Sequence, residues 1–235
     1  MAVSGSQDFR LNRTQVLDTA LKDLGVLRSG DTITNDSTLE TDCALKLNMM
    51  LKSWQNLGIQ LWVREEQTIA LTKGQNTYSW EVDGDINAAT PLRVVSAFHR
   101  NMTSNVDVDL TLMTKNEYDN LSNKDTTGTP TQFYFDYQDT TGSFKTWPAP
   151  NSNTYNAIAT FHKAYDDMDS ASDNLDFPQS WMETVVLNLQ IRLAPMFGKV
   201  LPQETIQLAA ITLQNAMEAS YEEGSVRFIP SFHRR

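Results

Sequence analysis

The sequence predicts a protein of the α+β class, in which a four-helix base carries an inserted antiparallel β-rich lobe and an extended C-terminal tail. Three observations lead to this prediction. Apolar residues recur every three to four positions near both ends of the 235-residue chain. Between these regions, over about residues 59–163, the apolar period changes to two. The last segment, residues 225–235, carries three arginines and no acid.

The first two helices are predicted over residues 14–24 and from Ser37 to about residue 57. Gly25 ends the first, and Ser37 with Glu40 forms the pattern of a capping box at the start of the second. The apolar positions of the second helix are Leu39, Cys43, Leu47, Met50, Trp54 and Leu57. We expect the two helices to form an antiparallel hairpin.

The middle of the chain reads as half-buried antiparallel sheet, with about six short strands between residues 59 and 163. The clearest alternation is at residues 106–112, where valine and leucine alternate with aspartate and threonine. Thr114 and Glu117 form a second capping box and predict a short helix within this region.

The second helix pair follows Pro178. Ser180 and Glu183 suggest a cap, and Pro195 should end or kink that helix. The last helix starts near Pro202 and continues to Gly224, with apolar positions at Ile206, Ala210, Leu213, Met217 and Tyr221. The predicted divisions are an N-terminal arm (1–10), the first half of the helical base (11–58), the β-rich lobe (59–175), the second half of the base (176–224) and the tail (225–235).

Composition places the chain among ordinary cytoplasmic proteins. It is 40% hydrophobic and 20% charged, and no apolar run approaches the roughly 20 residues of a membrane span. The N-terminus lacks the apolar centre of a secretory signal. A single cysteine, Cys43, excludes an internal disulfide framework. The net charge of −10 argues against general affinity for nucleic acid.

No pattern of catalytic, cofactor-binding or metal-binding residues stands out, and we expect the protein not to be an enzyme. The three histidines, His99, His162 and His233, lie far apart in the sequence, and there is no nucleophile elbow or phosphate-binding glycine loop. The acidic run at residues 166–176 is more typical of a solvated linker than of a calcium loop. An alternative function is a tail-associated, muramidase-like cell-wall glycosidase that uses Asp107 and Asp109, which share one strand face.

The tail resembles a ligand for another protein. Its apolar side chains, among them Phe228 and Phe232, would be exposed to solvent if they had no partner, and Pro230 prevents the last helix from continuing. A disordered terminus is one interpretation. The other is an arm that docks its aromatic rings and arginines on an acidic neighbour and becomes ordered as it binds.

Several motifs follow one another in a fixed order along the chain. They are the Trp-containing helix end at 49–54, Gly-Thr-Pro followed by aromatics and Asp at 128–136, Trp-Pro-x-Pro at 147–150, Leu-Asp-x-Pro at 175–178, and Arg-Leu-Ala-Pro-x-aromatic-Gly at 192–198. With these motifs the chain resembles the head-to-tail adaptor proteins of short-tailed phages, also called tail accessory or packaged-DNA stabilisation proteins. The similarity covers about residues 11–224.

This resemblance implies a structural virion protein at the head-tail junction, assembled in the host cytoplasm. About twelve copies would form a ring below the portal ring, extend the DNA channel, help to retain packaged DNA and offer a platform to downstream tail or nozzle proteins. Double-stranded DNA would pass through the lumen without sequence-specific binding. The portal-facing element is then expected to be the last helix with the tail, through Arg227, Phe228, Phe232, Arg234 and Arg235.

Overall fold

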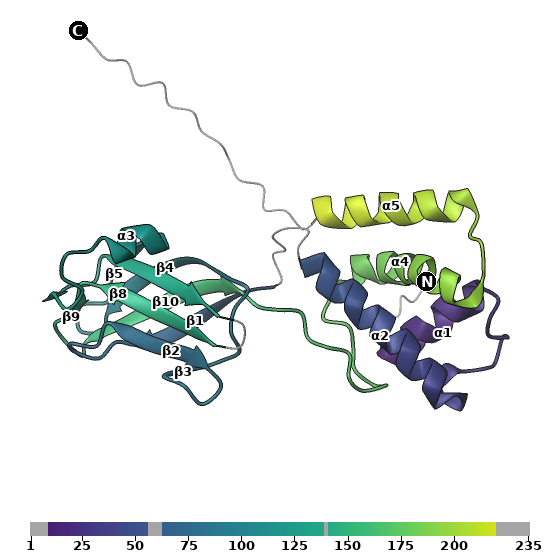
Figure 1. The fold of residues 1–235 in the computed structure, drawn as a ribbon, viewed down its shortest axis with the longest axis horizontal. Helices are drawn as coiled ribbons and strands as arrows, with labels where there is room; N and C mark the ends of the chain where they lie inside the picture. The colour runs from purple at the N-terminus through teal and green to yellow at the C-terminus, as the bar shows by residue number, and fades with distance from the viewer. Residues whose placement is uncertain (1–8, 56–62, 139–140, 220–235) are drawn as a thin grey trace, which may run out of the picture. The chain divides into compact units, whose positions relative to one another are not determined.

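The computed structural model of the protein describes residues 9–55, 63–138 and 141–219 (Figure 1). It has the mixed α+β architecture that the sequence predicts. The chain divides into two compact units. We call residues 62–165 the sheet unit, and the segments before and after it together form the helical unit. Each is described separately below.

The helical unit is arranged around α4. Its helices are α1 (Arg13–Asp23), α2 (Ser37–Trp54), α4 (Met182–Leu193) and α5 (Gln203–Glu218), with short 3₁₀ turns η1 (Ile33–Asn35), η4 (Gln179–Trp181) and η5 (Ala194–Phe197). Helices α1, α2 and α5 each contact α4, and α5 also contacts η4 (Figure 1). The buried residues of α1 and α2 are almost all apolar and recur at helical spacing, as the sequence predicts.

The start of α2 differs from the prediction. The N-cap is Asp36 and not Ser37, and the Asp36 carboxylate accepts two N–H groups of the first turn, both at 3.1 Å. Glu40 does not complete a capping box, because its carboxylate instead pairs with the Arg13 guanidinium of α1. Aspartate and serine are comparably good N-caps, so adjacent candidates cannot be ranked from sequence.

The predicted cap at Ser180 is also wrong, because Ser180 lies inside η4 and α4 starts after Trp181 without a side-chain cap. The effect of Pro195 is confirmed. Helix α4 ends two residues before it, the chain tightens into η5, and Gly198 closes the segment with a left-handed φ of 61°. Glycine adopts this conformation without the steric cost that a side chain would add.

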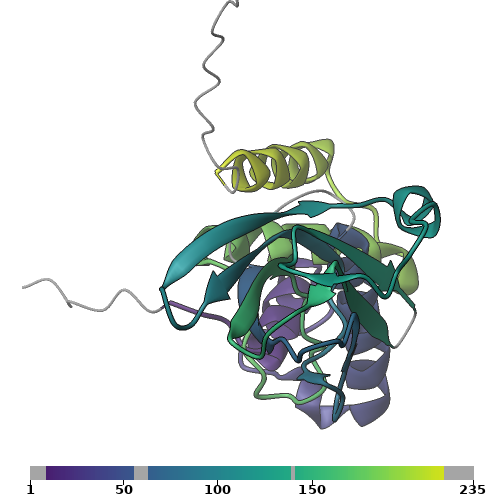
Figure 2. The ribbon, with the colours of Figure 1, turned by 90° about the vertical axis from the view of Figure 1, so that its left-hand side faces the viewer.

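The sheet unit contains an eight-stranded, nearly closed sheet in the order β1-β10-β4-β5-β7-β8-β2-β3 (Figures 1 and 2). Its strands are β1 (Arg64–Ala70), β2 (Thr77–Glu81), β3 (Ile86–Asn87), β4 (Arg93–Asn101), β5 (Val106–Leu112), β7 (Gln132–Tyr137), β8 (Gly142–Trp147) and β10 (Tyr155–His162). A second sheet pairs β6 (Thr127–Gly128) with β9 (Ala149–Pro150). Helix α3 (Lys115–Asp119) has the capping box predicted from Thr114 and Glu117.

The sequence predicted an antiparallel sheet, but not all neighbouring strands in the observed sheet are antiparallel. Strands β5 and β7 are joined in parallel, through only two register pairs, because α3 and the following loop return the chain to the start of the next strand. Strand β5 is also less buried than its alternation suggests, since only Leu110 is buried while Val106, Val108 and Leu112 are exposed. Residues 106–110 of β5 pair with β4, and only Thr111 and Leu112 pair with β7.

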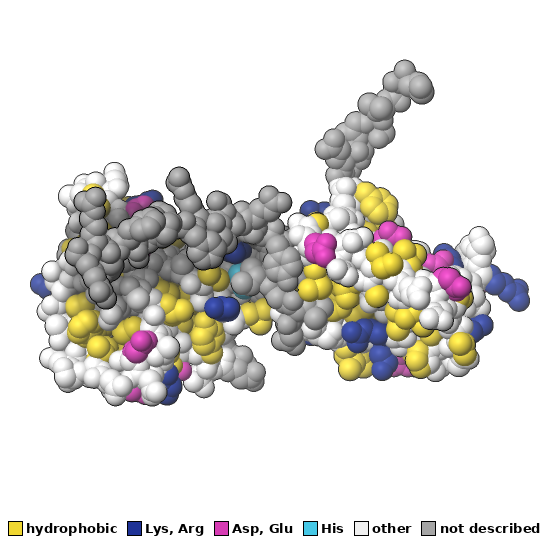
Figure 3. Space-filling view, turned by 90° about the horizontal axis from the view of Figure 1, so that it is seen from above, with side chains coloured by type: hydrophobic (Ala, Val, Ile, Leu, Met, Phe, Trp, Pro, Cys, Tyr) yellow, Lys and Arg dark blue, Asp and Glu magenta, His cyan; other side chains and the backbone are white. Residues whose placement is uncertain are grey.

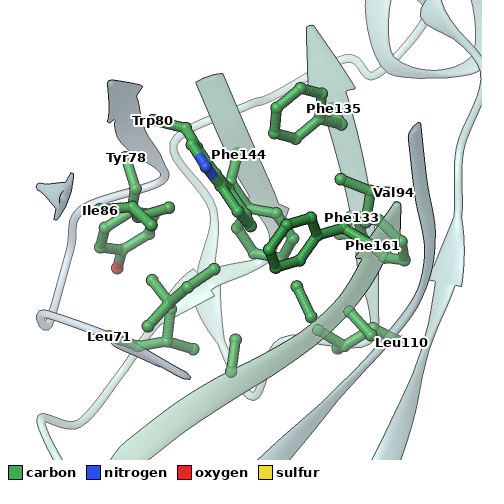
Figure 4. Close-up of a cluster of buried hydrophobic side chains, with 14 residues drawn as sticks. Leu71, Tyr78, Trp80, Ile86, Val94, Leu110, Phe133, Phe135, Phe144 and Phe161 are labelled. Carbon is green, nitrogen blue, oxygen red and sulfur yellow. The ribbon is translucent and has the colours of Figure 1, made fainter. Parts of the chain in front are cut away.

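The core of the sheet unit is aromatic (Figure 4). The Trp80 ring packs edge-on against Phe135 and Phe161, with centroids 5.5 and 5.2 Å apart, and its Nε1–H donates to the Ala89 carbonyl at 3.0 Å. Such pairs contribute about 0.5–1.5 kcal/mol each beyond the area they bury. The sheet unit therefore has its own hydrophobic core. The strand predicted from residue 59 falls partly on residues 56–62, which lie outside the described part.

Candidate interaction surfaces

The motifs that carry the family resemblance meet each other in space. In the sheet unit, Gly128 pairs with Pro150, and the Gly128 carbonyl accepts the Asn151 N–H at 3.0 Å. A Cβ on Gly128 would lie 3.3 Å from the Pro148 side chain, which is tighter than almost all such contacts. The Gly-Thr-Pro and Trp-Pro-x-Pro segments therefore need each other for packing.

The same holds in the helical unit. Trp54 at the end of α2 lies edge-on to Phe177 and Trp181, with ring centroids 6.2 and 5.6 Å apart, and the latter two rings are 5.5 Å apart. Arg192 donates from Nη2 to the Ser53 hydroxyl at 3.1 Å. The Trp-containing helix end thus contacts both later motifs. All these contacts hold the fold, and none of them forms a reaction centre.

A small aromatic cluster anchors α3 to the sheet. Tyr118 stacks on Tyr134 with centroids 5.2 Å apart, and the Lys145 ammonium lies 5.4 and 5.8 Å from the two ring centroids. Burial, together with the charge of the nearby Asp136, raises the pKa of Tyr134 to about 12. Lys145 also pairs with Asp136 at 3.7 Å. The tyrosine stays protonated at any working pH, and the cluster is a structural clamp.

The carboxylates proposed for glycoside hydrolysis do share one face of β5, as their spacing predicts. Asp107 receives two hydrogen bonds from the Arg100 guanidinium, both at 2.7 Å, and these lower its pKa. A general acid needs a raised pKa so that it keeps its proton. Asp107 has the opposite electrostatics, which disfavours it as the general acid of such a pair.

The other titratable candidates have structural surroundings. His99 and His162 are buried in the sheet unit, and burial lowers the pKa of both below the ordinary value; His233 lies outside the described residues. In the acidic run, Asp167 pairs with Lys52 at 2.8 Å, and Asp173 accepts the Ser170 N–H at 2.6 Å. Within the described ranges, no group of three or more His, Cys, Asp or Glu side chains is placed to hold a metal ion.

Helix α5 presents the most unusual surface of the helical unit. It packs on α4 through small side chains, with Ala209 and Ala216 buried, and the Ala209 carbonyl accepts the Asn188 amide at 3.3 Å. Three of its large apolar residues are exposed, Ile206 by 46%, Leu208 by 44% and Ile211 by 55%. Apolar side chains are visible on the helical unit in Figure 3. Of the apolar positions that the sequence marks along this helix, Ile206 and Ala210 are exposed, whereas Leu213 and Met217 are half-buried.

Three large apolar side chains of α5, Ile206, Leu208 and Ile211, remain exposed to solvent. The 16 residues of α5 include two acids and no lysine or arginine. Few charged side chains therefore hydrate its exposed surface. Exposed apolar surface of this kind marks sites of association. Among the described residues, α5 is thus the best candidate for contact with another protein.

A groove runs beside α4, on its α1 side. It has a volume of about 330 Å³ and is lined by Phe9, Leu11, Thr19, Asp23, Met182, Glu183, Val186 and Leu187. Five of these eight side chains are apolar, and the Phe9 ring is 62% exposed on the wall. The polar members include two carboxylates and no basic residue.

Comparison with known families identifies the chain. The model of one family, described as SU10 adaptor protein, matches residues 14–226, which is more than half of the sequence. This chain belongs to the SU10 adaptor protein family. A comparison with curated proteins gave no match.

The family name makes the chain a phage adaptor protein and a component of the virion, which agrees with the resemblance seen in the sequence motifs. An adaptor role also agrees with the exposed apolar side chains of α5 and with sequence motifs that pack against one another. In the part of the adaptor that the structure describes, no helix is long and apolar enough to cross a membrane.

The residues predicted to bind the portal, Arg227, Phe228, Phe232, Arg234 and Arg235, lie outside the described residues, which end at 219. Sequence reasoning proposed α5, together with these residues, as the portal-facing element. It missed the groove altogether. The groove is lined by segments almost 180 residues apart in the sequence, so no local sequence pattern predicts it.

Proposed function

We propose that this adaptor is a structural protein of the head-tail junction of a short-tailed phage. Copies of it bind below the portal ring as a ring of about twelve, extend the DNA channel, help to retain packaged DNA and provide the platform for downstream tail proteins. The helical unit serves as the four-helix base of this ring, and α5 with residues 225–235 forms the portal-facing element.

The observation that carries this proposal is the exposed apolar surface of α5 on a member of an adaptor family. A structural part that joins others needs such surfaces and needs no reaction centre. The tail follows α5 in the sequence after six residues and combines aromatic rings with arginines. Arginine and aromatic side chains are the commonest strong contributors to protein interfaces, which favours the tail as the other half of the contact.

The overall charge suits a channel component. With a net charge of −10, an acidic lumen would repel the DNA backbone and let it pass without sticking. Gel shifts at low salt check this part: we expect no shift of double-stranded DNA at micromolar adaptor. Tight, salt-dependent binding would contradict a passive channel.

Deletion of residues 225–235 tests the portal contact. The truncated adaptor should fold as the full chain does and lose binding to the portal ring of the same phage, measured by co-sedimentation and by electron microscopy of the complex. Deletion of residues 1–8 is the matched control and should leave binding intact. Unchanged binding of the tail-deleted protein would reject the assignment.

Salt separates the two kinds of contact in the tail. Exposed charge pairs are screened within about 8–10 Å at physiological ionic strength, so arginine contacts should weaken as salt rises. We expect portal affinity to fall at least fivefold between 50 and 500 mM NaCl. An affinity that does not change with salt would leave the aromatic rings as the whole of the contact. Images of the complex also count the copies directly.

A further inference from the structure

The groove on the α1 side of α4 has the chemistry of a peptide-binding site. Buried Met182 and Val186 with half-buried Leu187 come from one face of α4, and Phe9 and Leu11 from the segment before α1. A volume of about 330 Å³ lies at the lower end of the range for small-ligand sites and accepts one or two large side chains. Its floor would favour an aromatic ring.

The rim of the groove favours a cation. Asp23 and Glu183 are its charged residues, and both are acidic. The Asp23 carboxylate is held in place because it accepts the Gln190 side-chain amide at 2.7 Å. Glu183 is exposed in the first turn of α4. A ligand that suits this groove therefore combines an aromatic or aliphatic side chain with a nearby arginine or lysine.

The chain itself contains such a ligand. Residues 225–235 carry Val226, Phe228, Ile229 and Phe232 together with three arginines, and no acid. The other terminal segment, residues 1–8, suits the groove poorly, because it has no basic or aromatic side chain and carries Asp8. Charge complementarity selects the C-terminal segment.

The fold also brings the start of that segment to the groove. Helix α5 contacts η4, which directly precedes α4, so the C-terminal end of α5 lies at the N-terminal end of α4 (Figure 1). Met182 and Glu183 line the groove at this same end. The nine residues from 220 to 228 can span up to roughly 30 Å when extended. Helix α4, with 12 residues, is about 18 Å long. The reach therefore covers the whole groove.

We propose that the groove between α1 and α4 binds residues 225–235 of the same chain, with Phe228 over the apolar floor and the arginines beside Asp23 and Glu183. The contact is a resting site for the tail and needs no other protein. A consequence of this contact rests on the proposed function. A portal ring that binds the tail must first displace it from the groove, so the groove would keep the tail from binding other partners until a portal is present.

Limited proteolysis of the full-length protein tests the contact. Trypsin cleaves after Arg227, and a docked tail is protected. We expect Glu183→Lys to speed this cleavage at least fivefold at low salt, as followed by mass spectrometry. Glu204→Lys is the matched control, because Glu204 is likewise an exposed acid in the first turn of a helix but does not line the groove. Equal cleavage rates for the wild-type protein and Glu183→Lys would overturn the proposal.

A second measurement does not depend on charge. The double variant Leu187→Cys/Phe228→Cys, treated with oxidised glutathione, should form an intramolecular disulfide at least tenfold faster than Leu45→Cys/Phe228→Cys. Leu45 is exposed on α2 and is the control position. Equal rates, or a crosslink formed only between two copies, would contradict docking within one chain. Neither experiment contains portal, so failure here leaves the portal assignment standing, and the reverse also holds.

Discussion

Replacement of Trp181 by alanine tests whether the three-ring cluster holds the helical unit together. The Trp181 side chain is fully buried and lies 5.6 Å from Trp54 and 5.5 Å from Phe177, measured between ring centroids. An aromatic side chain of this kind buries about 150–250 Å², which at about 25 cal/mol per Å² corresponds to roughly 4–6 kcal/mol. Observed losses for Trp-to-Ala changes are about 3–5 kcal/mol, so we expect about 4 kcal/mol.

The loss should be confined to the helical unit, because the sheet unit has its own core. Hydrogen-exchange mass spectrometry of the full-length protein measures the opening free energy of α4 and of the strands separately. Trp181→Phe, which keeps a ring in place, should cost less than about 2 kcal/mol. A loss below about 1.5 kcal/mol for Trp181→Ala, or equal losses for the two variants, would refute the argument that ring packing carries this stability.

Two further predictions concern the sheet unit and α5. Burial lowers the pKa of His99 and His162 below the unfolded value near 6.5, so the unfolded chain binds more protons, and stability should fall as pH drops below about 6.5, by at most about 1.4 kcal/mol per pH unit for each histidine. Urea titrations of the sheet unit at pH 7.5, 6.0 and 5.0 measure this, and a flat profile would contradict it. Leu208→Ser/Ile211→Ser should change stability by less than about 0.5 kcal/mol per site, as surface changes do, while it weakens portal binding at least tenfold. Unimpaired portal binding would contradict the proposal that α5 forms part of the portal interface.

The elements that could be read correctly are those fixed by local chemistry. Thr114 and Glu117 are three residues apart and satisfy each other's backbone groups, so their capping box forms whatever surrounds it. Pro195 lacks an N–H and ends α4 for the same local reason. At the start of α2, Asp36 and Ser37 are both suitable N-cap residues, and the structure uses Asp36. Glu40 forms an ion pair with Arg13 of α1 and does not take part in a capping box.

Local patterns left burial undecided where it depended on a distant partner. The stripe through Ile206 is apolar at helical spacing, but the same helix offers a second stripe of small residues through Ala209 and Ala216. Periodicity finds both stripes and cannot tell which faces α4. Strand β5 alternates cleanly, yet only Leu110 is buried, because alternation marks an apolar face without showing whether other parts of the chain pack on it.

The amino-acid sequence alone determined the mixed α+β class, the order of helices and strands along the chain, and the ordered motifs that match an adaptor family. Each of these depends on interactions among residues a few positions apart or on a linear pattern. Tertiary structure decided which face of α5 is exposed, how β5 and β7 pair, and that an acidic, apolar groove exists beside α4. These features join segments remote in sequence, and their free energy depends on which surfaces close-packed neighbours cover, which no local period encodes.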